Sequence, residues 1–265
     1  MDGFSAAWVA HKKFGKKATY FPAVHQTPYP ASVKGNEVYM VDICYPEEVM
    51  RKMKRDASRV VVIDHHISQK KAVKISDDRL FDIKHSGSVL AWKYFFPKKK
   101  VPKLLQYVED VDIWKLSMPR TKEMAAALDS VKFSFKNWDK LYSELETARG
   151  RKKHLDKGKA VMDFMNNMID DIVSGAEEVK IGSHKAFAVN SPVLVSDVGH
   201  ILATKAKGVG IIWVKKSDRL KVSLRSTGKV DVSKIAQRYG GGGHKAAAAF
   251  SLPLKKDGGI TFPWK

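Results

Sequence analysis

The residues best suited to chemistry are Asp64, His65 and His66, which directly follow the apolar run at residues 60–63. A short apolar run of this kind is typical of a buried strand, which would present the three side chains at its carboxyl end. A metal-binding histidine usually has its second ring nitrogen held by a partner such as a carboxylate, and Asp64 could be that partner. The triplet therefore predicts a metal or acid–base site, with a hydrogen-bonded histidine pair as the structural alternative.

Further carboxylates follow other predicted elements. Asp42 comes directly after the apolar run 37–41, and Asp110 and Asp112 lie within residues 107–114. Each aspartate alone is more often a helix cap or a turn residue. Together with the triplet they offer oxygen and nitrogen ligands for Mn²⁺ or Mg²⁺. Two such ions about 3.5–4 Å apart can activate water to cleave phosphate esters.

A glycine-rich stretch provides a second candidate site. Gly240, Gly241, Gly242, Gly243 and His244 precede a run of alanines at residues 246–249. Glycines let successive backbone N–H groups approach an anion, and we expect a helix that begins at the alanine run and offers its positive end. The alternative is a flexible turn.

An arginine lies upstream of this stretch. Arg225, within residues 223–226, falls at the end of a predicted strand and suits bidentate contact with a phosphate.

The elements that position these residues alternate between strand and helix in the first half of the chain. This order predicts an α/β fold with a doubly wound, mainly parallel sheet. An amphipathic helix is expected over residues 155–173, followed by hairpins at 178–189 and 210–225. We therefore predict a metal-binding domain at residues 1–150, a connector helix at 151–177 and a smaller α/β domain at 178–265.

The composition limits the classes of function. Lysine and arginine number 48 against 28 aspartates and glutamates, giving a formal net charge of +20 that favours an anionic partner. No apolar stretch is long enough to span a membrane, and no secretory signal is evident, so we expect a cytoplasmic protein. Cys44 is the only cysteine, which excludes an internal disulfide, and we expect it to be a buried free thiol. Trp92 and Trp114 are expected in the core.

The motifs together resemble the DHH phosphoesterases with a C-terminal DHHA1 domain, in the oligoribonuclease and exopolyphosphatase-like superfamily. The name motif is Asp64-His65-His66, and Asp42 and Asp110 match the second and fourth motifs. Arg225 within residues 223–226, together with Gly241-Gly242-Gly243-His244, matches the DHHA1 signature. The similarity extends over nearly the whole chain.

The resemblance implies two Mn²⁺ or Mg²⁺ ions in a cleft between domains and hydrolysis by a metal-bound hydroxide. One ion would be held by Asp2, Asp42, His65 and Asp110. His66, with Asp64, would be catalytic beside the cleft, orienting water or phosphate. The phosphate of the substrate would be bound by Arg225, Gly241, Gly242, Gly243 and His244.

Asp2-Gly3 matches only the end of the first family motif. The other ligands of that motif, a histidine and an aspartate, would lie before Met1, so only one of the two metal sites is complete in this chain. We expect a preceding strand of about six to ten residues that carries them.

The expected function is a metal-dependent phosphoesterase that hydrolyses short oligonucleotides or small nucleotide phosphoesters. Two alternatives stay open: an exopolyphosphatase, and a one-metal protein that binds nucleotides or nucleic acid without catalysis. The expected partner is an anionic phosphate substrate, and a homodimer is possible. The sequence does not determine the substrate or the direction of attack.

Overall fold

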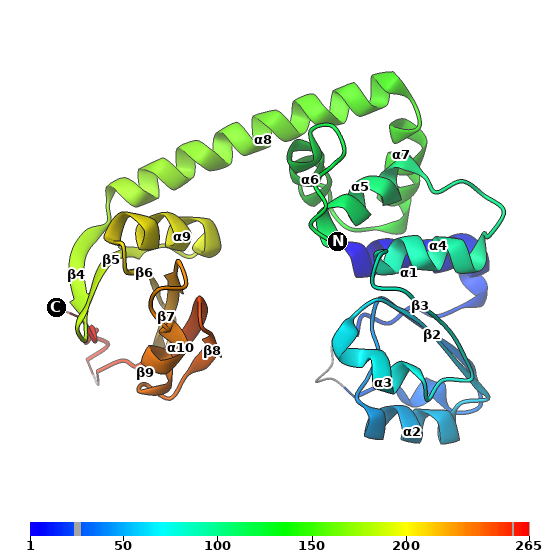
Figure 1. Cartoon of the computed structure of the whole chain (residues 1–265), viewed down its shortest axis with the longest axis horizontal. Coiled ribbons are helices and arrows are strands. Elements are labelled where there is room, and N and C mark those ends of the chain that lie inside the picture. Colours follow the sequence, from blue (N-terminus) through cyan, green and yellow to red (C-terminus); the bar gives the residue numbers. More distant parts are fainter. Residues whose placement is uncertain (24–27, 256, 265) are drawn as a thin grey trace. The chain divides into compact units, whose positions relative to one another are not determined.

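The structure is a computed structural model that describes residues 1–23, 28–255 and 257–264. The chain forms two compact units, residues 1–162 and 163–265 (Figure 1). The division falls within one continuous helix, α8 (Ala148–Ser174).

Unit 1 has a three-stranded parallel sheet of order β1-β2-β3. Its elements in chain order are α1 (Asp2–Phe14), η1 (Gly15–Lys17), η2 (Ala31–Val33), β1 (Glu37–Val41), α2 (Glu47–Asp56), β2 (Arg59–Asp64), η3 (Ile67–Gln69), α3 (Lys70–Val73), β3 (Asp78–Phe81), α4 (Gly87–Phe95), α5 (Lys103–Asp112), α6 (Thr121–Asp129) and α7 (Phe135–Leu145). The predicted strands at 37–41 and 60–63 are both present.

The central strand β2 is buried on both faces because successive side chains point to opposite sides of a sheet. Val60 and Val62 pack in a cluster with residues of α2 and α3. Val61 and Ile63 pack in a separate cluster with residues of α1 and α4. Helices therefore cover both faces, and the doubly wound α/β fold predicted for this region is confirmed. Cys44 is a buried free thiol in the first cluster.

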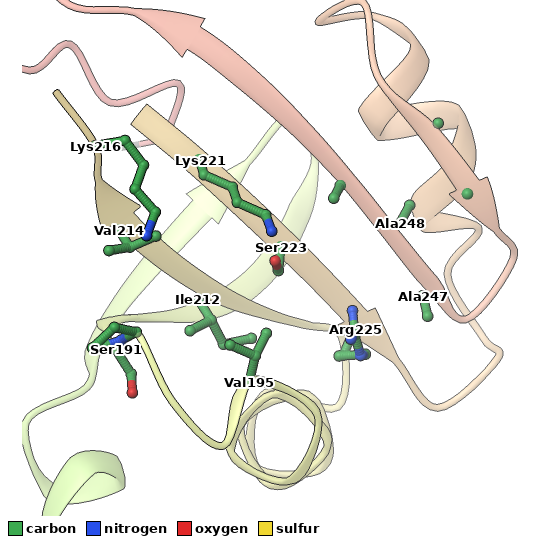
Figure 2. A pocket seen from close by; sticks show the side chains of 14 residues that line it. Ser191, Val195, Ile212, Val214, Lys216, Lys221, Ser223, Arg225, Ala247 and Ala248 are labelled. Atoms are coloured by element: carbon green, nitrogen blue, oxygen red, sulfur yellow. The ribbon is translucent and has the colours of Figure 1, made fainter. Parts of the chain in front are cut away.

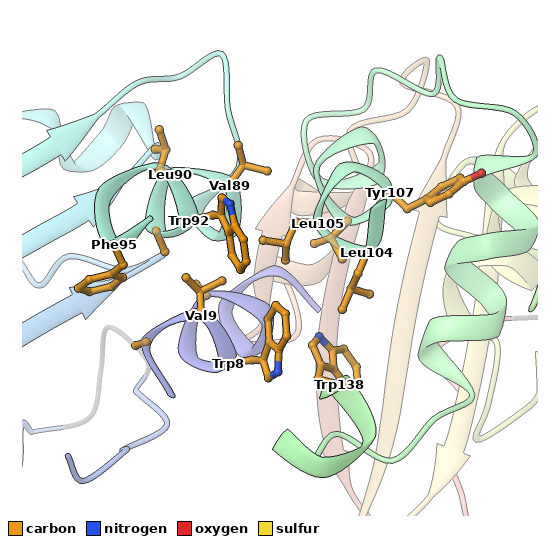
Figure 3. Packing of buried hydrophobic residues seen from close by; sticks show 14 of the residues in the cluster. Trp8, Val9, Val89, Leu90, Trp92, Phe95, Leu104, Leu105, Tyr107 and Trp138 are labelled. Atoms are coloured by element: carbon orange, nitrogen blue, oxygen red, sulfur yellow. The ribbon is translucent and has the colours of Figure 1, made fainter. Parts of the chain in front are cut away.

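The larger cluster of unit 1 is rich in tryptophan (Figure 3). Trp8 of α1, Trp92 of α4 and Trp138 of α7 are buried there, and the Trp138 indole N–H donates a hydrogen bond to Ser5 Oγ at 3.0 Å. The expectation that Trp114 also belongs to the core is wrong, since its side chain is 75% exposed. Trp114 follows the end of α5 in a left-handed conformation, φ 55°, at a sharp change of chain direction.

Unit 2 contains a six-stranded sheet of order β4-β5-β6-β7-β9-β8. Its elements are β4 (Glu177–Ile181), β5 (His184–Asn190), α9 (Val195–Ala206), β6 (Val209–Lys215), β7 (Arg219–Ser226), α10 (Val232–Gln237), β8 (Gly242–His244) and β9 (Ala247–Pro253). Only β5 and β6 pair in parallel. Both predicted hairpins are present, as β4-β5 and β6-β7. Ile212 packs with α9 and Ile211 packs with α10, so each helix covers one face.

The alanine run does not form the helix that we expected. Ala247, Ala248 and Ala249 begin strand β9, which pairs with β7 on one side and β8 on the other. Alanine has the highest intrinsic helix propensity, but intrinsic propensity is a weak preference, and here strand pairing and burial decide the conformation. Ala248 and Phe250 alternate into the core, and the backbone of β9 satisfies that of β7.

None of the helices in the described part of the chain is long and apolar enough to cross a membrane.

Trp138 is buried and Trp114 is exposed, so the two residues allow a matched test of this packing. We expect Trp138→Ala to lower the free energy of unfolding by about 3–5 kcal/mol, because a fully buried indole leaves a cavity. Trp114→Ala should change it by less than about 0.5 kcal/mol because the indole contributes little to the core. Urea unfolding followed by circular dichroism measures both values. Equal losses in the two variants would contradict the placement of Trp114.

Candidate functional site

The ends of several elements meet at the carboxyl edge of the parallel sheet. Asp42 directly follows β1, and Asp64 is the last residue of β2, the neighbouring strand. The Asp42 backbone N–H donates to the Ile63 carbonyl at 2.9 Å, which extends the strand pairing by one bond. Asp42 then adopts a left-handed φ of 60° and ends the strand. Parallel pairing thus brings the two predicted strand-end acids to one place.

Asp2 reaches the same place from the start of α1. Its carboxylate is buried and accepts the backbone N–H of Ser88, in the first turn of α4, at 3.2 and 3.4 Å. The start of α4 also packs against Asp42, since a Cβ at Gly87 would lie 2.5 Å from the Cβ and Oδ1 of Asp42. Only glycine permits this approach, which is why the position after Ser86 lacks a side chain.

His65 links these acids to the end of α5. Its Nε2 lies 3.2 Å from Asp42 Oδ1 and 3.5 Å from Asp112 Oδ2. Two sets of side chains can each bring their ligand atoms within 4.8 Å of one another: Asp2, His65 and Asp112, and Asp42, Asp64, His65 and His66. We call the residues Asp2, Asp42, His65 and Asp112 the acidic cluster.

The donor atoms of this site suit a bound cation. Asp42 Oδ1, Asp64 Oδ2 and His65 Nε2 are buried and make no well-formed hydrogen bond among the described residues, although Asp42 Oδ1 and His65 Nε2 lie 3.2 Å from each other. Buried polar atoms without partners are rare, and each one left so costs about 1–3 kcal/mol. Carboxylate oxygens and one imidazole are the ligands that Mn²⁺ and Mg²⁺ accept. The residues present therefore fit a hard divalent ion.

The electrostatics of the acidic cluster support the same conclusion. Burial, followed by the nearby charge of Asp2, raises the pKa of Asp42 to about 6, against the opposing effect of His65. Burial and the charge of Asp2 also raise the pKa of Asp112. Contact with Asp42 raises the pKa of His65 despite its burial. Acids forced together in this way are typical of functional sites, and a cation would relieve their repulsion.

Asp64 and His66 form a pair beside the cluster. The fully buried Asp64 accepts the backbone N–H of His65 at 2.8 Å through Oδ1, and the same oxygen lies 2.8 Å from His66 Nδ1. This contact places the ring proton of His66 on Nδ1, because the carboxylate can only accept. The His66 side chain is 45% exposed, so Nε2 is left to accept or donate a proton.

The expected ligand Asp110 does not join the cluster. It is buried and accepts four hydrogen bonds, from the Ser117 N–H, Ser117 Oγ, the Met118 N–H and Thr121 Oγ1. Burial would raise the pKa of Asp110, but these bonds outweigh it and hold the pKa below its usual value. Asp112, two residues later, takes the place near His65. Residues two apart on a helix point about 200° from each other, so only one of the two aspartates can face the site.

Unit 2 contains a separate cavity of about 470 Å³ on the face of its sheet (Figure 2). Arg225 lines it, with its guanidinium held by hydrogen bonds to the Leu224 carbonyl at 3.0 Å and Ser196 Oγ at 3.1 Å. Gly242 and Gly243 also line the cavity. The expected grouping of arginine and glycines is thus present for these three residues.

Gly241 and His244 lie outside the lining of this cavity. Gly241 packs against the next strand, where a Cβ would lie 2.2 Å from the Ala249 carbonyl, and His244 is exposed at the end of β8. Their predicted contact with phosphate stays a prediction. Two cations that sequence reasoning missed, Lys216 and Lys221, do line the cavity. The alternation of Lys221, Ser223 and Arg225 along β7 was the signal that could have revealed one of them.

Removal of the charge of Asp110 and of Asp112 should have opposite effects on stability and on Mn²⁺ binding. We expect Asp110→Asn to lower the free energy of unfolding by about 1–3 kcal/mol, because an amide cannot accept all four hydrogen bonds. Asp112→Asn should leave metal-free stability unchanged or raise it, since it removes repulsion with Asp2, yet weaken Mn²⁺ binding by at least about 10-fold. Urea unfolding in EDTA and Mn²⁺ titration calorimetry measure the two effects. The reverse pattern would restore Asp110 as the ligand.

The raised pKa of Asp42 predicts a pH dependence. Because protons compete with the cation, Mn²⁺ affinity should fall below a pH of about 6, the pKa of Asp42 in the folded chain, and level off well above it. Without metal, the folded chain keeps a proton that the unfolded chain loses above about pH 3.9, so stability should fall as pH rises through this window. Asp42→Asn should reduce this stability change and leave the smaller part that comes from the raised pKa of Asp112. A flat profile in the original chain would contradict the burial of this carboxylate.

Comparison with known proteins gives one family match. Residues 179–258 match the DHHA1 domain. A relative over nearly the whole chain is the uncharacterized protein R106 of Acanthamoeba polyphaga mimivirus, 28% identical over 288 aligned residues that cover 96% of this chain and 68% of the relative.

Two solved structures resemble this one at low identity. One is a pGpG-specific phosphodiesterase, PggH, from Vibrio cholerae, with 11% identity, a TM-score of 0.47 and coverage of 96% of this chain and 92% of that one. The other is an uncharacterized protein from Helicobacter pylori G27, with 16% identity, a TM-score of 0.42 and coverage of 95% and 90%. Because both TM-scores lie below 0.5, the assignment rests on the family match. The chain therefore contains a DHHA1 domain at residues 179–258, and the DHHA1 part of the resemblance seen in its motifs is confirmed.

Proposed function

We propose that this protein is a divalent-metal-dependent phosphoesterase that hydrolyses short oligonucleotides or small nucleotide phosphoesters. The observation that carries the proposal is the acidic cluster of unit 1, where the buried Asp42 Oδ1 and His65 Nε2 lie 3.2 Å apart and neither makes a well-formed hydrogen bond among the described residues. Asp2, Asp42, His65 and Asp112 would hold Mn²⁺ or Mg²⁺. A divalent ion held there supplies a nucleophilic water at neutral pH and neutralises charge on the phosphoryl oxygens.

The remaining steps are assigned to side chains of the chain itself. Asp64 fixes the tautomer and orientation of His66 through the 2.8 Å contact with Nδ1. His66 Nε2 can then hydrogen-bond water or a phosphoryl oxygen and pass a proton to the leaving oxygen when the ring is protonated. Asp64 is in this scheme a positioning residue, and His66 is the catalytic acid or base.

The DHHA1 domain would bind the phosphate-bearing substrate. Arg225 presents a guanidinium already fixed by two hydrogen bonds, which lowers the entropy lost on binding an anion. Val195, Ile212 and Val214 give the cavity an apolar part, and its volume of about 470 Å³ falls in the usual range for small ligands. Apolar surface suits a nucleoside better than an inorganic polyphosphate, so we favour nucleotide substrates over the exopolyphosphatase alternative.

The proposal is tested by substitution of one aspartate in the cluster and of a matched aspartate outside it. Asp42→Asn should lower kcat by at least about 100-fold for a short RNA and for bis-p-nitrophenyl phosphate with Mn²⁺, because it removes a metal-binding oxygen. Asp82 follows β3 at the same edge of the sheet but belongs to neither set of possible ligands. Asp82→Asn should change kcat by less than about threefold.

Mn²⁺ stoichiometry distinguishes the remaining alternatives. One bound ion without turnover of either substrate would favour a binding protein that has no catalytic function. Turnover of tripolyphosphate in preference to the RNA would favour an exopolyphosphatase. Equal activity of the Asp42→Asn variant and the original chain would reject the acidic cluster as the active site.

A further inference from the structure

Unit 1 contains a groove of about 770 Å³ between α2 and α3, which shares no residue with the acidic cluster. Residues of both helices pack in one buried cluster, and Figure 1 shows the two helices on the same side of the parallel sheet. Most of the residues that line the groove are cationic: Arg51, Lys54, Arg55, Lys71 and Lys74. The proposed hydrolysis gives this basic groove no role.

The spacing of the cations along each helix explains how they reach one groove. On α2 the residues Arg51, Lys54 and Arg55 follow the i, i+3, i+4 pattern of one helix face, and all three are exposed. Met50 and Met53 are buried and anchor the helix to the core. On the other wall, Lys71 of α3 and the residue that ends this helix, Lys74, are three positions apart. Packing of the two helices thus gathers cations from two separate segments of the chain.

Most of this positive charge is not neutralised by the protein. Arg51 lies 3.7 Å from Glu47, and Lys54 lies 2.9 Å from Asp77. The other three cations of the groove form no ion pair with any described residue. Glu47 is also the only acid among the residues that line the groove. A concave surface with an excess of one charge concentrates ligands of the opposite charge, so the groove suits an anion.

The chemistry of the lining indicates which anion fits. None of the described residues that line the groove is aromatic, and Ile75 is its only apolar residue. Base stacking requires aromatic side chains, a membrane surface requires apolar side chains that enter the lipid, and the centre of a protein interface is depleted of charge. Lysine and arginine bind phosphate groups well without these features.

The length of the groove favours several phosphates over one. The lining follows α2 from Glu47 to Arg55, slightly more than two helical turns, or about 12 Å. A single phosphoryl group would contact only part of this surface. A ligand with regularly repeated phosphates would contact cations along the whole groove.

We propose that the groove between α2 and α3 binds the phosphate backbone of a nucleic-acid strand without sequence preference. The strand is held by several successive phosphates, and its bases contribute no stacking contact in the groove. Binding requires neither the acidic cluster nor a metal ion, so this surface is independent of the proposed hydrolysis. RNA and DNA share the backbone that the groove recognises.

The same two helices offer matched control residues. Lys52 of α2 and Lys70 of α3 are exposed, yet neither lines the groove. The variant Lys52→Gln/Lys70→Gln therefore removes the same charge from the same helices as Lys71→Gln/Lys74→Gln, and it leaves the groove intact. The comparison separates binding in the groove from a general effect of the net charge of +20.

The test measures fluorescence anisotropy in EDTA, so that no hydrolysis occurs, with labelled oligouridylate, oligoadenylate and oligothymidylate of about 20 nucleotides. Lys71→Gln/Lys74→Gln should weaken binding of all three strands by at least about fivefold, and by the same factor within about twofold. The slope of log affinity against log salt concentration should become shallower by about 1.4, because each lost phosphate contact of a single strand contributes about 0.7. The control variant should change the affinity by less than about twofold.

A diuridylate probe distinguishes the groove from a site for short substrates. Its affinity should change less than about twofold in Lys71→Gln/Lys74→Gln, because a dinucleotide cannot contact cations along the whole groove. An equal loss for the dinucleotide and the long strands would overturn the proposal.

Other results would overturn the proposal as well. These are an equal loss in the control variant, an unchanged salt slope, or a loss confined to one of the three strands. Binding of phosphatidylserine vesicles that depends on Lys71 and Lys74, with strand binding unaffected by their substitution, would identify a membrane surface instead. Hydrolysis of short RNA with Mn²⁺ is measured separately on the same proteins. Strand binding without hydrolysis would support the groove and reject the proposed function, and hydrolysis with strand affinity insensitive to the two lysines would do the opposite.

Discussion

The candidate site of unit 1 depends on the burial of acidic side chains close to one another. Asp2 and Asp42 are brought together with His65 at the edge of a parallel sheet, and the pKa of Asp42 rises to about 6 in consequence. Such an arrangement is unfavourable by itself, since burial and like charge both disfavour ionisation. It persists because the surrounding elements fix each carboxylate: the start of α4 holds Asp2, and strand pairing with β2 holds the backbone of Asp42. A bound cation would convert this repulsion into attraction.

Some of the buried acids near the acidic cluster have a structural role and do not belong to the cluster itself. Asp64 and Asp110 are both buried carboxylates near the acidic cluster, and both hold neighbouring residues in place. Asp64 orients His66. Asp110 holds the loop from Ser117 to Thr121 after α5, which leaves Asp112 at the end of that helix free to face His65. Neither residue needs to touch a substrate to be essential for the geometry.

At their candidate sites the two units concentrate charge of opposite sign. The acidic cluster of unit 1 concentrates negative charge and suits a cation, whereas the cavity of unit 2 concentrates positive charge and suits an anion. This division explains how a chain with a net charge of +20 contains a strongly acidic site. The scattered lysines of the sequence become meaningful only where the fold gathers them on one surface, as it gathers Lys216 and Lys221 with Arg225.

The sequence by itself determined the parallel α/β fold, the acids and histidines at the ends of β1 and β2, and the DHHA1 domain. These features depend on local patterns, such as an apolar run that ends in Asp64-His65-His66. Local patterns can be recognised in a sequence without knowledge of the tertiary contacts. The tertiary structure alone decided that Asp112 rather than Asp110 approaches His65, because the phase of α5 is set by what packs against it. It also decided that the alanine run is a strand, because the backbone of these residues pairs with the backbone of β7. Contacts between residues distant in the chain control each of these outcomes. Such contacts cannot be read from the local sequence around the residues concerned.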